Sequence, residues 1–249
     1  MSGHSKWATI KRKKGAADAK RGQLFSKLTR AIIVAAKEGG PDPESNATLA
    51  NAIQKARDNS MPKDNIERAV ARGAGSSDGE AYESIAYEGY GPGGVAILCL
   101  ILTDNRNRAA SDVRHIFSKH GGALGTPGTV AWQFERKGII LVDADAVDED
   151  ALMEAALEAG AEDITVDGSQ WQVTTAPADF ASVRSGLDTT GIAYASAELT
   201  MVAKSTVAPN EAEARRLLKL VDALEENDDV QEVFANFDIS EEMLEAVAV

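Results

Sequence analysis

The sequence predicts an α+β protein: an N-terminal three-helix domain followed by two split βαβ (ferredoxin-like) domains, one inserted in the other. Three observations lead to this prediction. Apolar residues recur every three to four positions over the first 75 residues, which is the period of an amphipathic helix. Strand-like and helix-like segments alternate from residue 82 onward, and the last helix and strand of the chain have no core of their own.

The N-terminal domain is expected to hold three short helices. The first has an apolar face, which consists of Leu24, Leu28, Ile32 and Ala35. The segment Gly39-Gly40-Pro41 ends this helix, because glycine takes the left-handed cap conformation and proline cannot continue a helix. A second helix is expected near residues 46–58 and a third from Pro62 to Gly73. The Gly- and Ser-rich segment GAGSSDGEAYE then indicates a linker, so the first domain is assigned to residues 1–80.

Strand-like segments begin after this linker. ESIAYEGY and GVAILCLILT read as two strands joined by the turn Gly91-Pro92-Gly93-Gly94, residues 106–120 as a helix, and TVAWQFE as a further strand. The glycine turn leads into a strand and is not followed by GKS or GKT, so it is not a phosphate-binding P-loop. Cys99 lies in the second strand, where we expect a buried packing residue.

Residues 138–203 form a self-contained series. They read as strand, helix, two strands, helix and strand, which is the order of a ferredoxin-like unit. A helix at residues 210–226 and the strand VQEVFANF remain. We expect these two elements to complete the βαβ unit begun at Gly94. The result is a discontinuous domain of residues 81–137 and 204–249 around an inserted domain of residues 138–203.

Charge is distributed unevenly along the chain. The formal net charge is −13, with 26 Lys and Arg against 39 Asp and Glu. Residues 1–30 hold nine basic residues and one acidic residue, whereas residues 141–249 hold five basic and 25 acidic residues. A basic block at one end of an acidic chain is typical of proteins in which that end binds a polyanion and the rest repels it.

This basic arm is the strongest functional candidate. Each Lys or Arg that neutralises a phosphate releases condensed counterions, which is the main source of affinity for a nucleic acid. Trp7 can stack on a base, and His4 can add a hydrogen bond. The alternative is a solvated tail without a partner. The candidate nucleic-acid-binding residues are His4, Lys6, Trp7, Lys11, Arg12, Lys13, Lys14, Lys20, Arg21, Lys27 and Arg30.

A second candidate is a basic strip on the helix that follows TDNR. It consists of Arg106, Arg108, Arg114 and Lys119, and the alternative is an ordinary solvated helix face. Asp104 or Asn105 is expected to cap this helix. His115 and His120 lie five positions apart, about 140° around a helix, so they do not form the i, i+4 histidine pair of a metal site.

Nothing in the sequence predicts an enzyme. A single cysteine excludes a disulfide framework and a cysteine zinc site, no GxSxG elbow is present, and the acidic segments lack the spacing of a calcium loop. No metal, cofactor or small-molecule substrate is therefore expected. No apolar run approaches the ~20 residues of a membrane span, so we expect a cytoplasmic protein without a membrane partner, and a monomer.

Four long segments carry a family resemblance. They are GHSKWATIKRKK, GGPDPESNATLANAIQKARDNSMPKDNIERAV, YEGYGPGGVAILCLILTDNRNR and RHIFSKHGGALGTPGTVAWQFERKG. With them the chain resembles the YebC family of gene-expression regulators, whose mitochondrial relatives include the translational activator of cytochrome c oxidase. The resemblance implies a three-domain, non-enzymatic cytoplasmic protein. The family is described as transcriptional regulatory and DNA-binding, and some members act instead on ribosomes that stall at proline-rich stretches.

Two functions therefore stay open. The protein is a translation factor that acts on ribosomal or messenger RNA, which we favour, or a DNA-binding transcriptional regulator. An enzyme on a ferredoxin-like scaffold is a distant third. The acidic residues 141–249 disfavour close wrapping of duplex DNA, and no recognition helix is evident.

Overall fold

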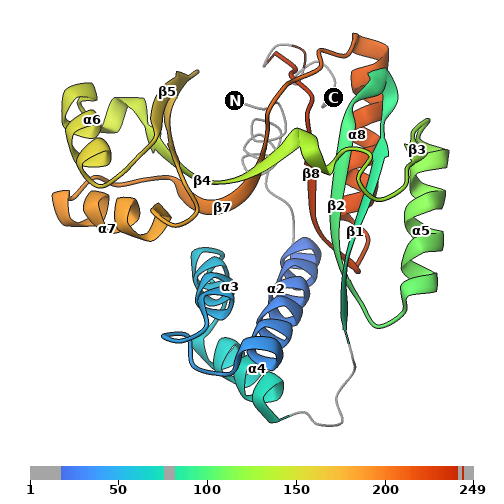
Figure 1. Cartoon of the computed structure of the whole chain (residues 1–249), viewed down its shortest axis with the longest axis horizontal. Helices are drawn as coiled ribbons and strands as arrows, with labels where there is room; N and C mark the ends of the chain where they lie inside the picture. Colours follow the sequence, from blue (N-terminus) through green and yellow to red (C-terminus); the bar gives the residue numbers. More distant parts are fainter. Residues whose placement is uncertain (1–17, 76–81, 241–242, 244–249) are drawn as a thin grey trace. The chain divides into compact units, whose positions relative to one another are not determined.

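The computed structural model describes residues 18–75, 82–240 and 243. In these residues three helices precede two separate four-stranded antiparallel sheets (Figure 1). The predicted α+β class is therefore confirmed. No helix in this part of the chain is long and apolar enough to cross a membrane.

The described residues form two compact units. One unit consists of residues 132–206, and the other combines the residues before 132 with those from 207 onward. The chain thus leaves the second unit and returns to it. The predicted limits of three domains, 1–80, 81–137 with 204–249, and 138–203, stay a prediction.

The N-terminal helices are α2 (Asp18–Gly39), α3 (Ala47–Asp58) and α4 (Lys63–Gly75). They enclose a core that includes Leu28, Ile32, Leu49, Ile53 and Ile66. Leu24, expected on the buried face of α2, is instead 38% exposed. At 1.5 Å per residue α2 is about 33 Å long, whereas α3 and α4 are each about 20 Å long, so they cannot cover all of α2.

Asn46 joins two of these helices. Its side-chain oxygen accepts a hydrogen bond from the backbone N–H of Leu49 at 3.0 Å, which caps α3. Its amide nitrogen donates to the backbone oxygens of Ala35 and Gly40, each at 2.8 Å. The buried side chain of Asn46 therefore bonds a backbone N–H at the start of α3 and two backbone carbonyls at the end of α2.

The first sheet has the strand order β3-β1-β2-β8. Its strands are β1 (Glu83–Tyr90), β2 (Ala96–Thr103), β3 (Ala123–Leu124) and β8 (Val230–Ala235), and its helices are α5 (Arg106–Lys119) and α8 (Glu211–Glu225). Strand β8 pairs antiparallel with β2, and Leu98 lies opposite Phe234. The prediction that the last strand joins the sheet of residues 94–103 is confirmed.

The hairpin between β1 and β2 also forms as predicted. The single-turn 3-10 helix η1 (Pro92–Gly94) connects the two strands, and Gly93 and Gly94 have φ angles of +77° and +75°, which favour glycine. Cys99 on β2 is fully buried, and this burial raises the pKa of its thiol. It is the inert packing residue that the sequence predicts.

The predicted strand TVAWQFE is only partly correct. Residues Ala131–Gln133 form a 3-10 turn, η2, and the strand that follows, β4 (Phe134–Asp143), belongs to the second sheet. The short β3 takes its place in the first sheet. The physical reason is Glu88, whose carboxylate binds the backbone N–H groups of Gly128, Val130 and Ala131, so that these groups are not available to a strand ladder.

The second sheet has the order β5-β6-β4-β7 with antiparallel neighbours throughout. Its further elements are α6 (Glu149–Glu158), β5 (Asp163–Asp167), β6 (Gln170–Thr175), α7 (Phe180–Thr190) and β7 (Ser196–Ala203). This is the ferredoxin-like arrangement that the sequence predicts for the inserted segment. Its core includes Ile140, Val142, Leu152, Val173 and Leu187.

Candidate nucleic-acid interface

The basic arm leads directly into α2. His4, Lys6, Trp7, Lys11, Arg12, Lys13 and Lys14 lie outside the described residues. Lys20 lies in the first turn of α2, and the next residue, Arg21, is exposed. Lys27 and Arg30 follow on the same helix and are only half-exposed. The described part of the predicted interface therefore begins at the N-terminal half of α2.

Lys27 contacts the segment between α8 and β8. Its ammonium donates to the backbone oxygen of Glu225 at 2.5 Å, and the side-chain amide of Gln23 donates to the backbone oxygen of Glu226 at 2.6 Å. The last carbonyl groups of a helix have no partner within that helix, and a cation near them stabilises the helix end. Lys27 thus has a structural partner at the C-terminus of α8.

Arg30 is the second tie between α2 and this segment. Its guanidinium donates to the backbone oxygens of Asp228 at 2.6 Å and Leu102 at 3.2 Å. The same group stacks over the ring of Tyr82, 5.2 Å from the ring centre, a distance typical of a cation–π contact. The prediction that Lys27 and Arg30 contact a nucleic acid stays a prediction, and both residues also anchor α2.

Asp229 is the buried centre of this contact. Its carboxylate accepts a hydrogen bond from the hydroxyl of Thr103 at 3.0 Å and forms an ion pair with Arg108 at 2.9 Å and a longer one with Arg30 at 3.7 Å. Hydrogen bonds to Asp229 and then Asp104 raise the pKa of Arg108. Arg108 is therefore held by two carboxylates, unlike the solvated strip that the sequence suggests.

The other residues of the predicted strip lie on two faces of α5. Arg106, Arg114 and Lys119 are all exposed, and Asn105 caps the helix as expected by accepting from the N–H of Arg108 at 3.0 Å. At about 100° per residue, Arg106 and Arg114 each lie roughly 140° from Lys119. The strip is thus not one continuous line of charge.

Two features of the unit that contains the first sheet were not predicted from the sequence. The first is the loop after β3, which Glu88 organises with three hydrogen bonds of 2.7, 2.7 and 2.8 Å. Burial acts to raise the pKa of Glu88, but the backbone donors outweigh it and the pKa is lowered. The second is a group of cations on α8, Arg215, Arg216 and Lys219. These cations were not predicted as a group because the net charge of residues 141–249 is strongly negative.

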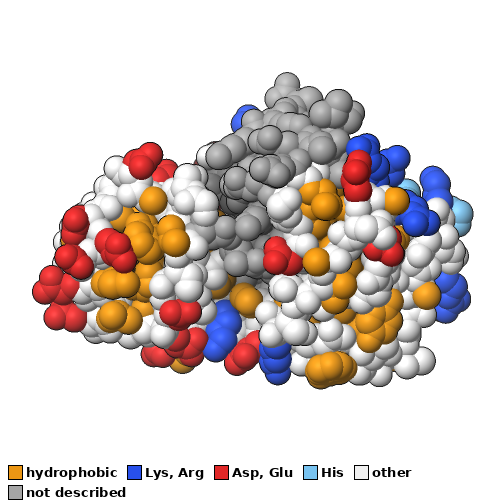
Figure 2. Space-filling model, turned by 90° about the horizontal axis from the view of Figure 1, so that it is seen from above, with side chains coloured by type: hydrophobic (Ala, Val, Ile, Leu, Met, Phe, Trp, Pro, Cys, Tyr) orange, Lys and Arg blue, Asp and Glu red, His pale blue; other side chains and the backbone are white. Residues whose placement is uncertain are grey.

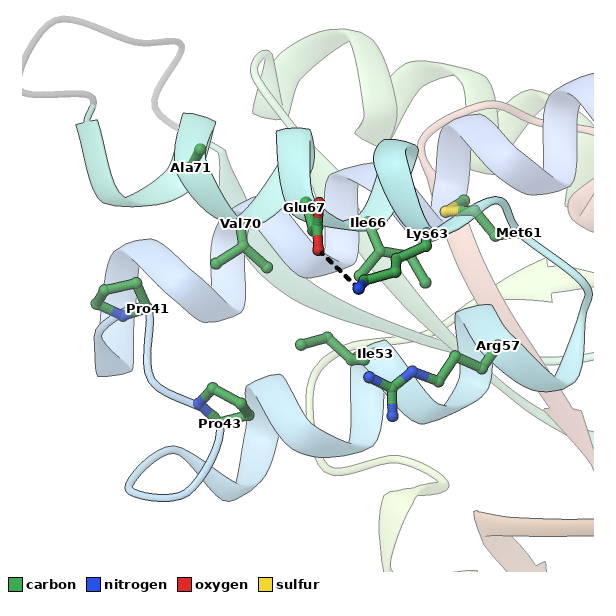
Figure 3. A pocket seen from close by; sticks show the side chains of 10 residues that line it. All are labelled: Pro41, Pro43, Ile53, Arg57, Met61, Lys63, Ile66, Glu67, Val70 and Ala71. Carbon is green, nitrogen blue, oxygen red and sulfur yellow. Dashed lines mark ion pairs between the residues drawn. The ribbon is translucent and has the colours of Figure 1, made fainter.

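The helical region also contains a groove between α3 and α4, with a volume of about 420 Å³. Ile53, Met61 and Ile66 form part of its apolar lining. Figure 3 shows Pro41 and Pro43 at one end and the ion pair of Lys63 and Glu67, 3.5 Å long, at its rim. None of its ten lining residues is a Ser, Cys, His or Asp.

The fold places the chain in a class of proteins whose helical N-terminal region is followed by two α/β units. A family model of the TACO1/YebC N-terminal domain matches residues 5–76, and one of the TACO1/YebC second and third domain matches residues 82–237. The chain belongs to the TACO1/YebC family.

Individual relatives span the whole chain. The chain is 66% identical over 249 residues to a "Probable transcriptional regulatory protein" of Rubrobacter xylanophilus. It is 53% identical to one of Syntrophus aciditrophicus, and both matches cover all of this chain and all of the relative. It is also similar to the crystal structure of a conserved hypothetical protein from Aquifex aeolicus. That match has a TM-score of 0.80 and 50% identity, and covers 90% of this chain and 93% of the other.

Proposed function

We propose that the protein is a non-enzymatic, nucleic-acid-binding regulator of gene expression that acts on RNA at the ribosome as a translation factor. One observation carries this proposal. Residues 1–30 have nine basic residues and one acidic residue, whereas residues 141–249 have five basic and 25 acidic residues. An arm of this charge binds phosphates through counterion release, and the acidic body disfavours wrapping of a long duplex.

The contacts of α2 support a positioned arm. The arm continues into α2, and Lys27 and Arg30 tie α2 to the segment between α8 and β8. The helix that follows the arm in the sequence is therefore held against the end of α8. This contact supports a function in which the arm and the unit that contains the first sheet bind one surface together, as a factor bound to a ribosome must.

The family resemblance supplies the finer proposal. Some members relieve ribosomes stalled at proline-rich stretches, and we propose the same role for this chain. In this proposal the domains are residues 1–80, 81–137 with 204–249, and 138–203, and the protein works as a monomer in the cytoplasm without a cofactor.

Co-sedimentation with ribosomes tests the proposal. At near-physiological salt the protein should sediment with ribosomes, and duplex DNA in excess by phosphate should not compete it off. The quadruple substitution of Lys11, Arg12, Lys13 and Lys14 by glutamine should abolish co-sedimentation. A charge-matched control replaces four exposed cations elsewhere by glutamine: Lys63, Arg68, Arg136 and Lys204. If both variants behave alike, the arm is not the ribosome-binding element.

The alternative is a DNA-binding transcriptional regulator. The names of the relatives from Rubrobacter xylanophilus and Syntrophus aciditrophicus favour it. A specific regulator binds its site at least ~1,000-fold more tightly than random duplex. Such a ratio for one promoter sequence, together with equal competition by DNA and ribosomes per phosphate, would establish the alternative and exclude the translation factor.

A further inference from the structure

A second basic surface lies where α5 and α8 pack together. We name it the α5–α8 basic face, and its members are His115, Lys119, His120, Arg215, Arg216 and Lys219. Figure 2 shows Lys, Arg and His side chains gathered on one side of the molecule, the side on which Figure 1 places α5. Four of the members, Lys119, Arg215, Arg216 and Lys219, are exposed basic side chains in a chain whose net charge is −13.

Helix geometry aligns these side chains. His115 and Lys119 are four positions apart on α5, and Arg215 and Lys219 are four positions apart on α8, so that each pair shares a helix face. The two helices pack through one core that contains Phe117 and Leu220. The two helices therefore lie side by side, and each carries cations among its exposed residues.

His120 shows that the two sets of charges meet. It caps the C-terminus of α5. Burial lowers the pKa of His120 most, and the charges of Lys119, Lys219 and His115 lower it further. These groups come from both helices, so cations of α5 and of α8 both lie within electrostatic reach of His120.

Arg215 is the member of the face that pairs with a carboxylate among the described residues. Glu211 pairs with Arg215 at 2.8 Å, and Glu213 accepts from the backbone N–H of Asn210 at 2.9 Å in the capping box of α8. Among the residues that the structure describes, Lys119, Arg216 and Lys219 form no ion pair. Three exposed cations are thus free to bind an anionic partner.

We infer that the α5–α8 basic face is a second phosphate-binding surface, which holds the backbone of structured RNA while the arm binds elsewhere on the same RNA. The inference rests on the proposed function for the identity of the polyanion. The face contains cations on long side chains and no Phe, Tyr or Trp, so it suits phosphates rather than stacked bases. Its cations lie on two helices packed roughly 8–10 Å apart, which suits an extended backbone.

Binding of a fluorescently labelled 20-base-pair RNA duplex tests this inference. The variant Lys119→Gln/Lys219→Gln removes two charges from the face, and the control Arg136→Gln/Lys204→Gln removes two exposed charges outside it. At ~0.9 counterions per phosphate contact, the face variant should lose roughly 10- to 30-fold in affinity at 0.15 M salt and about 1.8 in salt slope. The control should change affinity less than about two-fold.

Histidine NMR signals give a second, local measurement. The chain has three histidines, of which His115 and His120 belong to the face and His4 to the arm, and the variants His115→Asn and His120→Asn assign the signals. Bound phosphates should raise the pKa of His120, because they offset the charges of Lys119, Lys219 and His115.

The outcomes separate the two proposals. If the duplex binds but the face variant matches the control and the His120 signal does not move, the face is not an RNA surface and the proposed function stands. If the wild-type protein binds no RNA, both proposals are wrong. Tighter binding of poly-glutamate than of RNA at the face would replace this inference by a protein partner.

Discussion

Glu88 offers the sharpest test of how the first sheet is held together. The residue is 6% exposed, and its carboxylate accepts hydrogen bonds from the backbone N–H groups of Gly128, Val130 and Ala131 at 2.7, 2.7 and 2.8 Å. These bonds fold the loop after β3 back onto β1. Replacing Glu88 by alanine leaves three backbone N–H groups without this acceptor, and replacing it by glutamine places an NH₂ group against at least one of them.

The expected cost follows from these bonds. A hydrogen bond to a charged group contributes about 1.5–3 kcal/mol, and such bonds on one group are not additive. We therefore expect Glu88→Ala to lower the free energy of unfolding by about 3–5 kcal/mol and Glu88→Gln by about 2–4 kcal/mol. The control Glu83→Gln alters an exposed carboxylate on the same strand and should cost less than about 0.5 kcal/mol.

Urea denaturation followed by circular dichroism measures these costs, and amide hydrogen exchange shows whether residues 125–131 lose protection. The pKa of Glu88 is lowered in the folded protein, so its carboxylate stabilises the fold above the unfolded pKa of about 4.3 and this contribution is lost as the pH falls. The difference between wild type and Glu88→Gln should thus be complete at pH 7 and shrink below about pH 4. An unchanged midpoint at pH 7, with unchanged exchange in the loop, would refute the reasoning.

Two further substitutions test the contacts of the helical region. Asn46→Ala removes the cap of α3 and the side-chain donor to the carbonyl of Gly40, so thermal denaturation should show a loss of about 2 kcal/mol; a change below about 0.5 kcal/mol would contradict the bridging role. Asp229→Asn should cost about 2–3 kcal/mol, because the guanidinium groups of Arg30 and Arg108 lose their shared carboxylate. Amide hydrogen exchange in α2 should also accelerate in this variant, and unchanged exchange would show that Asp229 does not hold α2 in place.

Most of the fold could be predicted because its signals are local. Asn46, Asn105 and Asn210 each accept the backbone N–H three residues later, as helix caps do. The pairing of β8 with β2 required one further argument, that a lone helix and strand need an existing core. The order of the inserted elements determined the second sheet in the same way.

The two incorrect predictions, the strand TVAWQFE and the burial of Leu24, concern features that depend on residues far away in the sequence. TVAWQFE alternates like a strand, but Glu88, about 40 residues earlier, takes its backbone donors. No pattern within a short window contains that information. Leu24 fits the apolar spacing of α2, yet its burial depends on the lengths of α3 and α4, and it is exposed.

The candidate site was predictable as a charge pattern and not as a set of partners. The net charge of each sequence segment identified the arm. The cations of α8 lie in a segment whose net charge is negative, so they did not stand out. The segment charges also gave no sign that Arg30 and Lys27 contact backbone oxygens near the end of α8. Basic residues on a helix read alike in the sequence whether they face solvent or a neighbouring helix end.

The distribution of charge between the two compact units bears on the choice between RNA and DNA. Residues 132–206 hold four basic and 14 acidic residues, so this unit is repelled by any phosphate backbone that approaches it within the Debye length of about 8 Å at physiological salt. The arm and the α5–α8 basic face both belong to the rest of the chain. A long duplex presents phosphates all around its axis. A protein that binds it non-specifically therefore gains affinity from a uniformly basic surface. A ribosome presents RNA beside protein, which allows the basic elements to bind phosphate while the acidic unit contacts a surface that is not RNA. The charge separation therefore supports the proposed ribosomal target over the alternative of duplex DNA.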